Sequence, residues 1–165
     1  MPTAPPAERI TGCTCYRLRK LTRRITQHYD VRLASAGLRV TQYSLLANLC
    51  RGGRATMSAL AAAMEMDRTT LTRNLKPLAD TGLVEVMPGA DARARIVAAT
   101  ARGRRAWQDA RELWREAQDE VNRALGPEQV AALHDLLDDS VTRLRAARAV
   151  KDDAAQASRK PRRRR

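Results

Sequence analysis

The chain has 165 residues, 44% of them hydrophobic, and its 31 lysines and arginines against 18 acidic residues give a formal net charge of +13. This length suits one compact domain with appended helices and excludes two independent cores. The charge favours a polyanionic partner, with nucleic acid ahead of an anionic membrane. Six of the positive charges lie in residues 159–165, so the rest of the chain is basic without them.

The two ends of the chain differ from its centre in composition. Residues 1–8 are rich in proline and lack the apolar core of a secretory signal, and no apolar run is long enough to span a bilayer. We therefore expect a disordered N-terminus, a cytoplasmic protein and no membrane partner. Residues 151–165 are expected to form a disordered basic tail. Three cysteines do not make a disulfide framework, which favours reduced thiols.

The first half of the chain shows helical periodicity. Apolar residues over 9–36 recur at helical spacing and predict a long amphipathic helix, which Gly37 ends: Ile10, Leu18, Leu21, Ile25, Tyr29 and Leu33. A second helix is expected through Cys50 with Thr41 as its N-cap, and Thr56 is expected to cap a short third helix.

A fourth helix is predicted between Asp67, which suits an N-cap, and Gly82, which suits a C-terminal stop. Leucines at positions 71, 75 and 78 give it a buried side. The opposite face carries hydrogen-bond donors and no carboxylate: Arg68, Thr69, Thr72, Arg73 and Lys76.

The pattern then changes from helical to extended. Residues 83–87 are apolar around one charge, residues 95–99 contain Ile96 and Val97, and the two segments flank a turn-rich link, which predicts a β-hairpin. Thr100 suits the cap of a helix over 101–125, and Gly126-Pro127 separates it from a last helix that ends near Val150. The predicted fold class is mainly α with a small β-hairpin (α+β).

Several short segments, in this order, resemble those of the MarR family of winged helix-turn-helix regulators over about residues 9–149. They are 37–43 (GLRVTQY), 58–61 (SALA), 67–73 (DRTTLTR), 82–84 (GLV) and 91–95 (DARAR), the last followed by Thr100 and Gly103. The resemblance implies a DNA-binding lobe over 37–100, with the hairpin as its wing. It assigns residues 9–36 and 101–150 to a dimerisation lobe.

This resemblance also implies a partner and a location. A homodimer would place two recognition helices about 34–36 Å apart on a pseudo-palindromic operator in double-stranded DNA. The protein would be bacterial, cytoplasmic and associated with the nucleoid.

The DNA-binding candidates lie mainly on the fourth helix and in the wing. Arg73 suits a bidentate contact to guanine, and Arg93 at the wing tip suits an A·T-rich minor groove. The family pattern implies that Asp91 orients Arg93, and Arg95 is expected to contact phosphate. Without the surrounding motifs, the same helix face would be interpreted as a solvated surface. The full set is Thr56, Arg68, Thr69, Thr70, Thr72, Arg73, Lys76, Asp91, Arg93 and Arg95.

A signal-sensing site is suggested by the family, whose members respond to oxidants or small phenolic acids. Basic neighbours of the first two cysteines favour a reactive thiolate, although a cysteine packed at a dimer interface fits the same pattern. A zinc site through Cys13, Cys15 and His28 lacks a fourth ligand, so we expect no metal and no cofactor. The candidates for an effector or redox role are Cys13, Cys15, Tyr16, His28 and Tyr43.

The sequence contains no catalytic pattern that predicts an enzyme. We expect a sequence-specific transcriptional regulator, a repressor released by a phenolic or aromatic acid or by an oxidant. The alternatives are a non-specific architectural DNA-binding protein and a helical protein-interaction module.

Overall fold

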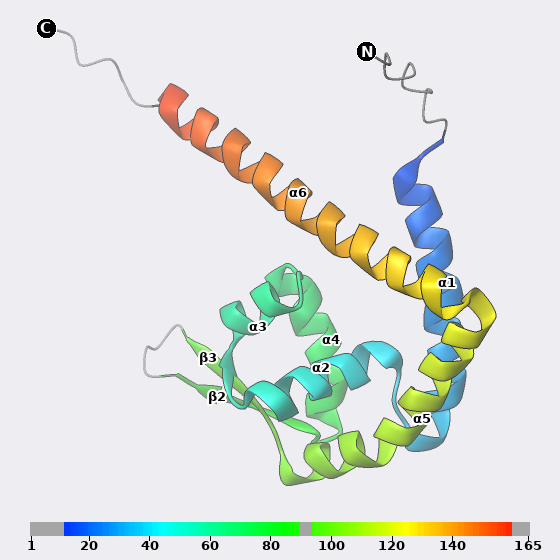
Figure 1. The fold of residues 1–165 in the computed structure, drawn as a ribbon. Helices are drawn as coiled ribbons and strands as arrows, with labels where there is room; N and C mark the ends of the chain where they lie inside the picture. The colour runs from blue at the N-terminus through cyan, green and yellow to red at the C-terminus, as the bar shows by residue number, and fades with distance from the viewer. Residues whose placement is uncertain (1–11, 90–93, 160–165) are drawn as a thin grey trace, which may run out of the picture. The chain divides into compact units, whose positions relative to one another are not determined.

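A computed structural model describes residues 12–89 and 94–159 (Figure 1). The chain divides into two compact units, one up to Asp119 and one from Glu120. Its elements, in order, are α1 (Thr14–Leu33), the short 3-10 helix η1 (Ala34–Ala36), α2 (Val40–Gly52), β1 (Ala55–Thr56), α3 (Met57–Ala63), α4 (Arg68–Asp80), β2 (Val84–Pro88), β3 (Arg95–Ala99), α5 (Ala101–Leu125) and α6 (Pro127–Arg159). This mainly helical architecture with a small antiparallel sheet confirms the predicted fold class.

The first unit begins with α1, whose apolar side buries Tyr29 and Leu33. α1 packs against α2, and Tyr29 also reaches α5, where its hydroxyl donates to Gln118 Oε1 at 2.5 Å. Gly37 follows η1 with a φ of 67°, a left-handed conformation that glycine adopts without strain. The chain therefore turns at the predicted glycine.

The start of α2 differs from the prediction. Thr41 lies inside the helix, which begins at Val40, so it is not the N-cap. The first N–H groups are satisfied from elsewhere: Asp30 Oδ1 accepts from the backbone N–H of Val40 at 2.8 Å, and Gln42 Oε1 accepts from that of Arg39 at 2.8 Å. A carboxylate on α1 thus replaces the expected hydroxyl, because the two helices pack together.

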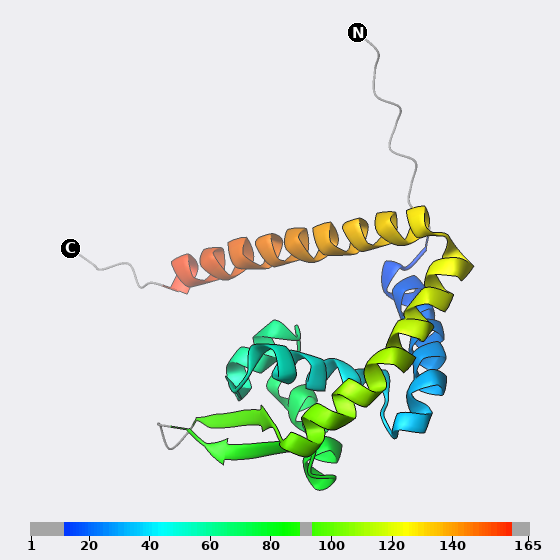
Figure 2. The ribbon, with the colours of Figure 1, turned by 60° about the horizontal axis from the view of Figure 1, so that its bottom comes forward.

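The sheet has three antiparallel strands in the order β1-β3-β2. β2 and β3 form the predicted hairpin, with Val86 opposite Val97 and Pro88 opposite Arg95, and Figure 2 shows the pair extending away from the helices. The two-residue strand β1 pairs Ala55 with Val97 on the other side of β3. It is too short to leave a periodic signal in the sequence.

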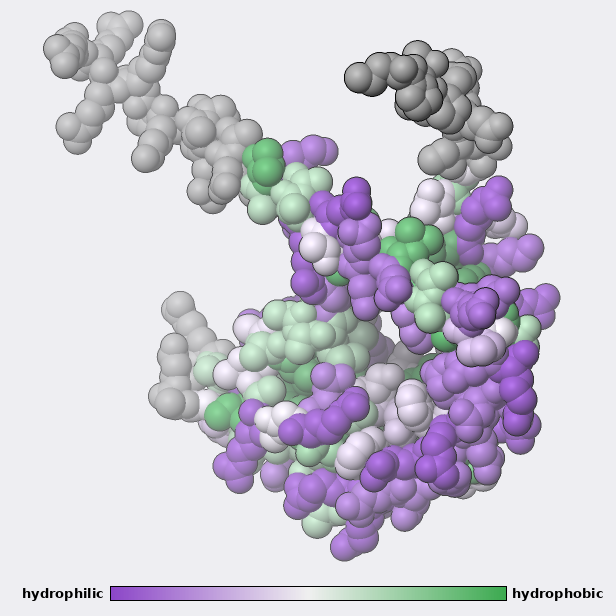
Figure 3. Space-filling view, in the orientation of Figure 1, coloured by the Kyte–Doolittle hydropathy of each residue, from purple (hydrophilic) through white to green (hydrophobic). Residues whose placement is uncertain are grey.

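The core of the first unit joins the helices to β3. Its largest fully buried side chains are Leu33, Leu45, Leu46, Leu71, Leu78 and Val97. Burial of such a side chain stabilises the fold by about 1.5–3 kcal/mol. Outside this core the surface over α5 is mostly hydrophilic (Figure 3).

α5 begins against the end of the sheet. Thr100 Oγ1 accepts from the N–H of Gly103 at 3.0 Å, so the predicted cap is confirmed. The same hydroxyl donates to the carbonyl of Gly82 at 2.8 Å, which ties the end of the hairpin to the turn after α4.

The second unit contains the end of α5 and α6. α6 continues to Arg159, past Val150, where the sequence predicts its end. Residues 151–158 are rich in alanine and contain no glycine or proline, so helix propensity favours this extension. The exposed large apolar residues of α6 are Leu136, Leu137, Val141, Leu144 and Val150. In the described part of the chain, no helix has both the length and the apolar composition that a bilayer crossing requires.

Candidate nucleic-acid interface

α3 and α4 form a helix-turn-helix whose starts are both capped by side chains. Thr56 Oγ1 accepts from the N–H of Ala59 at 3.1 Å, and Asp67 Oδ1 accepts from the N–H of Thr70 at 2.9 Å. Both caps are the ones that the sequence predicts. In the turn between the helices, Glu65 takes a left-handed φ of 53°, a conformation that is uncommon for residues other than glycine.

α4 is held by its apolar side and leaves its polar side free. Leu71, Leu75 and Leu78 are buried, and the helix contacts α2, α3 and β2. The predicted DNA-contacting residues of α4 are all exposed: Arg68, Thr69, Thr70, Thr72, Arg73 and Lys76. Most of this face carries positive charge and hydroxyl groups, which suits contact with phosphates and base edges.

The hydroxyl groups on this face differ in their partners. Thr70 Oγ1 donates to Asp67 Oδ2 at 2.6 Å, and Thr72 Oγ1 donates to the carbonyl of Arg68 at 2.8 Å. Within the described residues, the side chain of Thr69 makes no hydrogen bond. The pKa of Asp67 is lowered, because the hydroxyl and N–H of Thr70 both stabilise its charged form.

Further along α4, Lys76 Nζ lies 2.7 Å from Asp80 Oδ2 in an exposed i,i+4 pair. Such pairs are weak in water, so the ammonium can exchange this partner for a phosphate. The sequence analysis predicted a face of α4 without a carboxylate, so the pairing of Lys76 with Asp80 was not expected.

The wing supplies one further predicted contact. Arg95 is the first residue of β3 and is exposed. Asp91 and Arg93, predicted for the minor groove, lie outside the described residues. Thr56, also predicted to contact DNA, is exposed and caps α3.

An aromatic cluster joins α1, α2 and α5 within the first unit. The ring of Tyr43 stacks on that of Trp114 with centroids 5.7 Å apart and an interplanar angle of 13°. Tyr29 lies 6.4 Å from Trp114 in a tilted arrangement, and His28 meets Tyr29 edge-on at 6.2 Å. The sequence marked His28 and Tyr43 as effector candidates but missed both tryptophans of the chain, which are Trp107 and Trp114.

Beside this cluster, α2 and α5 enclose a hollow of about 540 Å³. Its lining includes three arginines, Arg51, Arg111 and Arg115, together with Tyr43, Trp107, Gln108, Glu112 and Trp114. The guanidinium of Arg111 lies 5.5 Å from the ring centroid of Trp107, and Arg115 pairs with Glu112 at 2.5 Å.

The polar groups that line this hollow differ in their hydrogen bonding. The indole N–H of Trp107 is buried and has no hydrogen-bond partner among the described residues. Burial raises the pKa of the Tyr43 hydroxyl, while the neighbouring Trp107 indole and the charges of Arg111 and Arg51 oppose that shift. Flat apolar rings beside guanidinium groups suit an aromatic anion.

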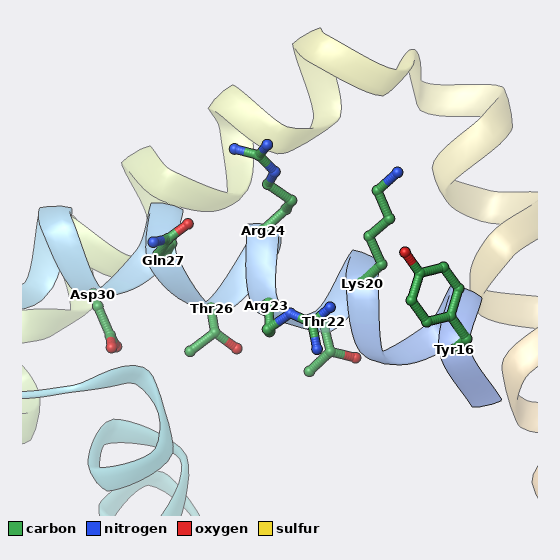
Figure 4. Close-up of a pocket in the computed structure, with 8 residues that line it drawn as sticks. All are labelled: Tyr16, Lys20, Thr22, Arg23, Arg24, Thr26, Gln27 and Asp30. Carbon is green, nitrogen blue, oxygen red and sulfur yellow. The ribbon is translucent and has the colours of Figure 1, made fainter.

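The other effector candidates lie elsewhere. Cys13 and Cys15 are exposed at the start of α1, and Tyr16 is also exposed. Tyr16, Lys20 and Arg24 border an open hollow along α1 of about 680 Å³, in which Lys20 and Arg24 extend to the same side of the helix (Figure 4). The five predicted effector residues therefore do not form one site. Tyr43 lines the hollow between α2 and α5, and neither cysteine does.

A metal site was not expected. No group of three or more potential ligands (His, Cys, Asp or Glu) that could hold a metal ion occurs in residues 12–89 and 94–159.

Comparisons with known proteins agree with this architecture. The family model that describes the MarR family matches residues 36–94. The transcriptional regulator MosR of M. tuberculosis in complex with DNA is 41% identical, with 90% of this chain and 100% of that chain covered and a TM-score of 0.65. A second structure of MosR is 40% identical over 79% of this chain and 96% of that chain, with a TM-score of 0.66.

More distant structures share the fold. A variant of MarR from E. coli complexed with operator DNA is 22% identical, with 76% of this chain and 91% of that chain covered and a TM-score of 0.69. No curated protein matches the chain. The capped helix-turn-helix, the β2–β3 wing and the 41% identity to MosR over 90% of the chain together establish that this chain belongs to the MarR family of transcriptional regulators.

Proposed function

We propose that the chain is a homodimeric transcription repressor that binds a pseudo-palindromic operator through α4 and the wing. The observation that carries this proposal is the exposed face of α4 around Thr69 and Arg73, which presents cations and hydroxyls while the leucines behind it are buried. The relative MosR was solved in complex with DNA. Such a protein would act in the bacterial cytoplasm, at the nucleoid.

A mobility-shift assay tests sequence-specific binding. The duplex would carry the promoter of the protein's own gene, with a scrambled duplex of equal composition as competitor. A repressor should keep its own promoter bound when the scrambled DNA is in excess. Equal affinity for both duplexes would favour the architectural DNA-binding alternative instead.

The proposed dimer is supported by the apolar surface of α6. Leu137, Val141 and Leu144 follow one another at helical spacing and are exposed, and an exposed apolar surface of this kind is typical of an interface. Leu144→Asp is expected to shift the molar mass measured by light scattering from dimer towards monomer. Ala146→Asp, which lies on the opposite side of the helix, is the matched control and should leave the mass unchanged.

The proposed signal is a small aromatic acid bound in the hollow between α2 and α5. Tyr43 and Trp114 supply ring faces, Arg51 and Arg111 supply positive charge, and the buried indole N–H of Trp107 supplies a donor beside the Tyr43 hydroxyl. α2 contacts α4. A ligand that binds better when α2 has moved relative to α5 would therefore lower DNA affinity.

Benzoate is a suitable probe of this hollow, with benzamide as its uncharged control. Benzoate should change the fluorescence of Trp107 and Trp114 and weaken DNA binding, while benzamide should do neither. Arg111→Gln is expected to weaken benzoate binding about tenfold. Arg105→Gln, an exposed arginine of α5 outside the hollow, should bind benzoate like the wild type. Equal binding of benzoate by both variants would remove Arg111 from the site.

An oxidant is the second proposed signal, and the exposure of both Cys13 and Cys15 favours it. Peroxide should weaken DNA binding of the wild type and leave the double variant Cys13→Ser, Cys15→Ser unchanged. Cys50→Ser, which removes a half-buried thiol on α2, is the control and should respond like the wild type. Identical responses of all three proteins would exclude the cysteines from sensing.

A further inference from the structure

Three threonines of α4 lie on or beside the proposed DNA-binding face, and their hydroxyl groups are not equivalent. A threonine hydroxyl has one hydrogen to donate. Thr70 donates it to Asp67 Oδ2 at 2.6 Å, and Thr72 donates it to the backbone carbonyl of Arg68 at 2.8 Å. Thr69 is exposed, and its hydroxyl donates to none of the described residues.

This difference decides which hydroxyl can contact the acceptors of DNA. Phosphate oxygens, the N7 and O6 atoms of guanine and the O4 atom of thymine only accept hydrogen bonds. Thr70 and Thr72 can donate to them only by breaking a bond that they already make inside the helix.

Two further features separate Thr70 from Thr69. Both oxygens of the Asp67 carboxylate are bound by Thr70, one through its hydroxyl and one through its N–H. The negative charge beside the Thr70 hydroxyl therefore disfavours a phosphate at that point. Thr69 stands four residues before Arg73, so the two side chains lie on the same side of α4.

We propose that Thr69, together with Arg73, determines the base preference of α4, and that the hydroxyls of Thr70 and Thr72 do not read bases. This inference rests on the proposed sequence-specific DNA binding. The base-contacting groups of α4 would then be the hydroxyl of Thr69 and the guanidinium of Arg73. Two neighbouring donors of this kind match the adjacent acceptors on a purine edge in the major groove.

Three matched substitutions test the inference, because valine replaces the hydroxyl of threonine by a methyl group of similar size. The DNA is a duplex selected by the wild-type protein from a random library, with a panel of single base-pair changes and a scrambled duplex. Fluorescence anisotropy gives the affinity for each duplex, and circular dichroism with thermal unfolding confirms that each variant is folded.

Thr69→Val is expected to bind the selected duplex about tenfold more weakly, to lose the preference at one base-pair position, and to bind the scrambled duplex like the wild type. Thr69→Ser restores the hydroxyl and should restore that preference. Thr70→Val and Thr72→Val should keep the wild-type order of preference across the panel. Thr70→Val should also lower the melting temperature, since it removes a contact of the helix cap.

Two results would overturn this inference and leave the proposed function standing. One is an unchanged base preference in Thr69→Val, and the other is a changed base preference in Thr70→Val or Thr72→Val. If the wild type binds the selected and scrambled duplexes equally, the proposed function fails, and the inference fails with it.

Discussion

The carboxylate of Asp30 on α1 accepts a hydrogen bond from the backbone N–H of Val40, the first residue of α2, at 2.8 Å. The bond satisfies one of the N–H groups that a helix start leaves open. It also fixes α1 to the helix that contacts α4. One side chain therefore joins α1 to α2, the helix that packs against α4 of the helix-turn-helix.

Removal of this cap should destabilise the protein. Asp30→Ala is expected to lower the free energy of unfolding by about 1 kcal/mol, the usual cost of losing an N-cap side chain, as measured by urea denaturation. Asp30→Asn keeps an acceptor oxygen and should lose much less. Asp109→Ala, at an exposed site on α5, serves as the control and is expected to stay within about 0.5 kcal/mol of the wild type. Equal losses in the variants at positions 30 and 109 would contradict the role of the cap.

Gly103 lies where α5 packs against the backbone of Leu83, just before β2. A Cβ atom at this position would lie 1.9 Å from the carbonyl oxygen of Leu83, so the backbone would have to move. Gly103→Ala should lower the free energy of unfolding by about 1–3 kcal/mol, as overpacked core substitutions do. Gly52→Ala is the matched control, because a Cβ there meets nothing within 4 Å. It should raise stability by up to about 1 kcal/mol, since alanine is the better helix former. A Gly103→Ala variant as stable as the wild type would show that α5 does not approach the Leu83 carbonyl this closely.

The sequence predicts the parts of the fold whose causes are local. The caps at Thr56 and Asp67 depend on residues within one helical turn, and the spacing of the leucines in α4 identifies its buried side. The hairpin follows from two apolar runs around a turn. Each of these signals spans only a few neighbouring residues.

Contacts between distant segments are the parts that the sequence did not reveal. Asp30 caps α2 from another helix, and Tyr43 meets Trp114 only because α2 packs against α5. The left-handed Glu65 has no glycine to indicate it. The DNA contacts predicted for Asp91 and Arg93 stay predictions. The hydroxyl bonds of Thr70 and Thr72 depend on side-chain rotamers, which no sequence pattern specifies.

The cap at Asp67 should make the stability of α4 depend on pH. Its pKa is lowered from the usual 3.8 by the hydroxyl and N–H of Thr70, so folding favours the charged carboxylate. This contribution is fully present above pH 3.8 and is lost as the pH falls through the lower pKa of the folded protein. The melting temperature of the wild type should therefore exceed that of Asp67→Ala at neutral pH, and the difference should shrink in acid. Asp67→Asn, which accepts a hydrogen bond without a charge, should show a difference from Asp67→Ala that does not change with pH. A wild-type advantage over Asp67→Ala that is as large in acid as at neutral pH would contradict this assignment.

Arg73 and Arg95 should affect DNA binding in different ways, because one lies on the proposed reading face of α4 and the other at the start of β3. Arg73→Ala is expected to weaken binding to the selected duplex about tenfold or more and to relax the preference at one base pair. Arg95→Ala should weaken binding to the selected and scrambled duplexes by the same factor, since a phosphate contact carries no sequence information.

Titrations at several salt concentrations provide a second measurement of the role of Arg95. The slope of log affinity against log salt should become shallower by about one for each Arg95 removed, so by about two in a dimer. If Arg95→Ala instead changed the order of preference among the duplexes and left the salt dependence as it was, Arg95 would be a base-reading residue.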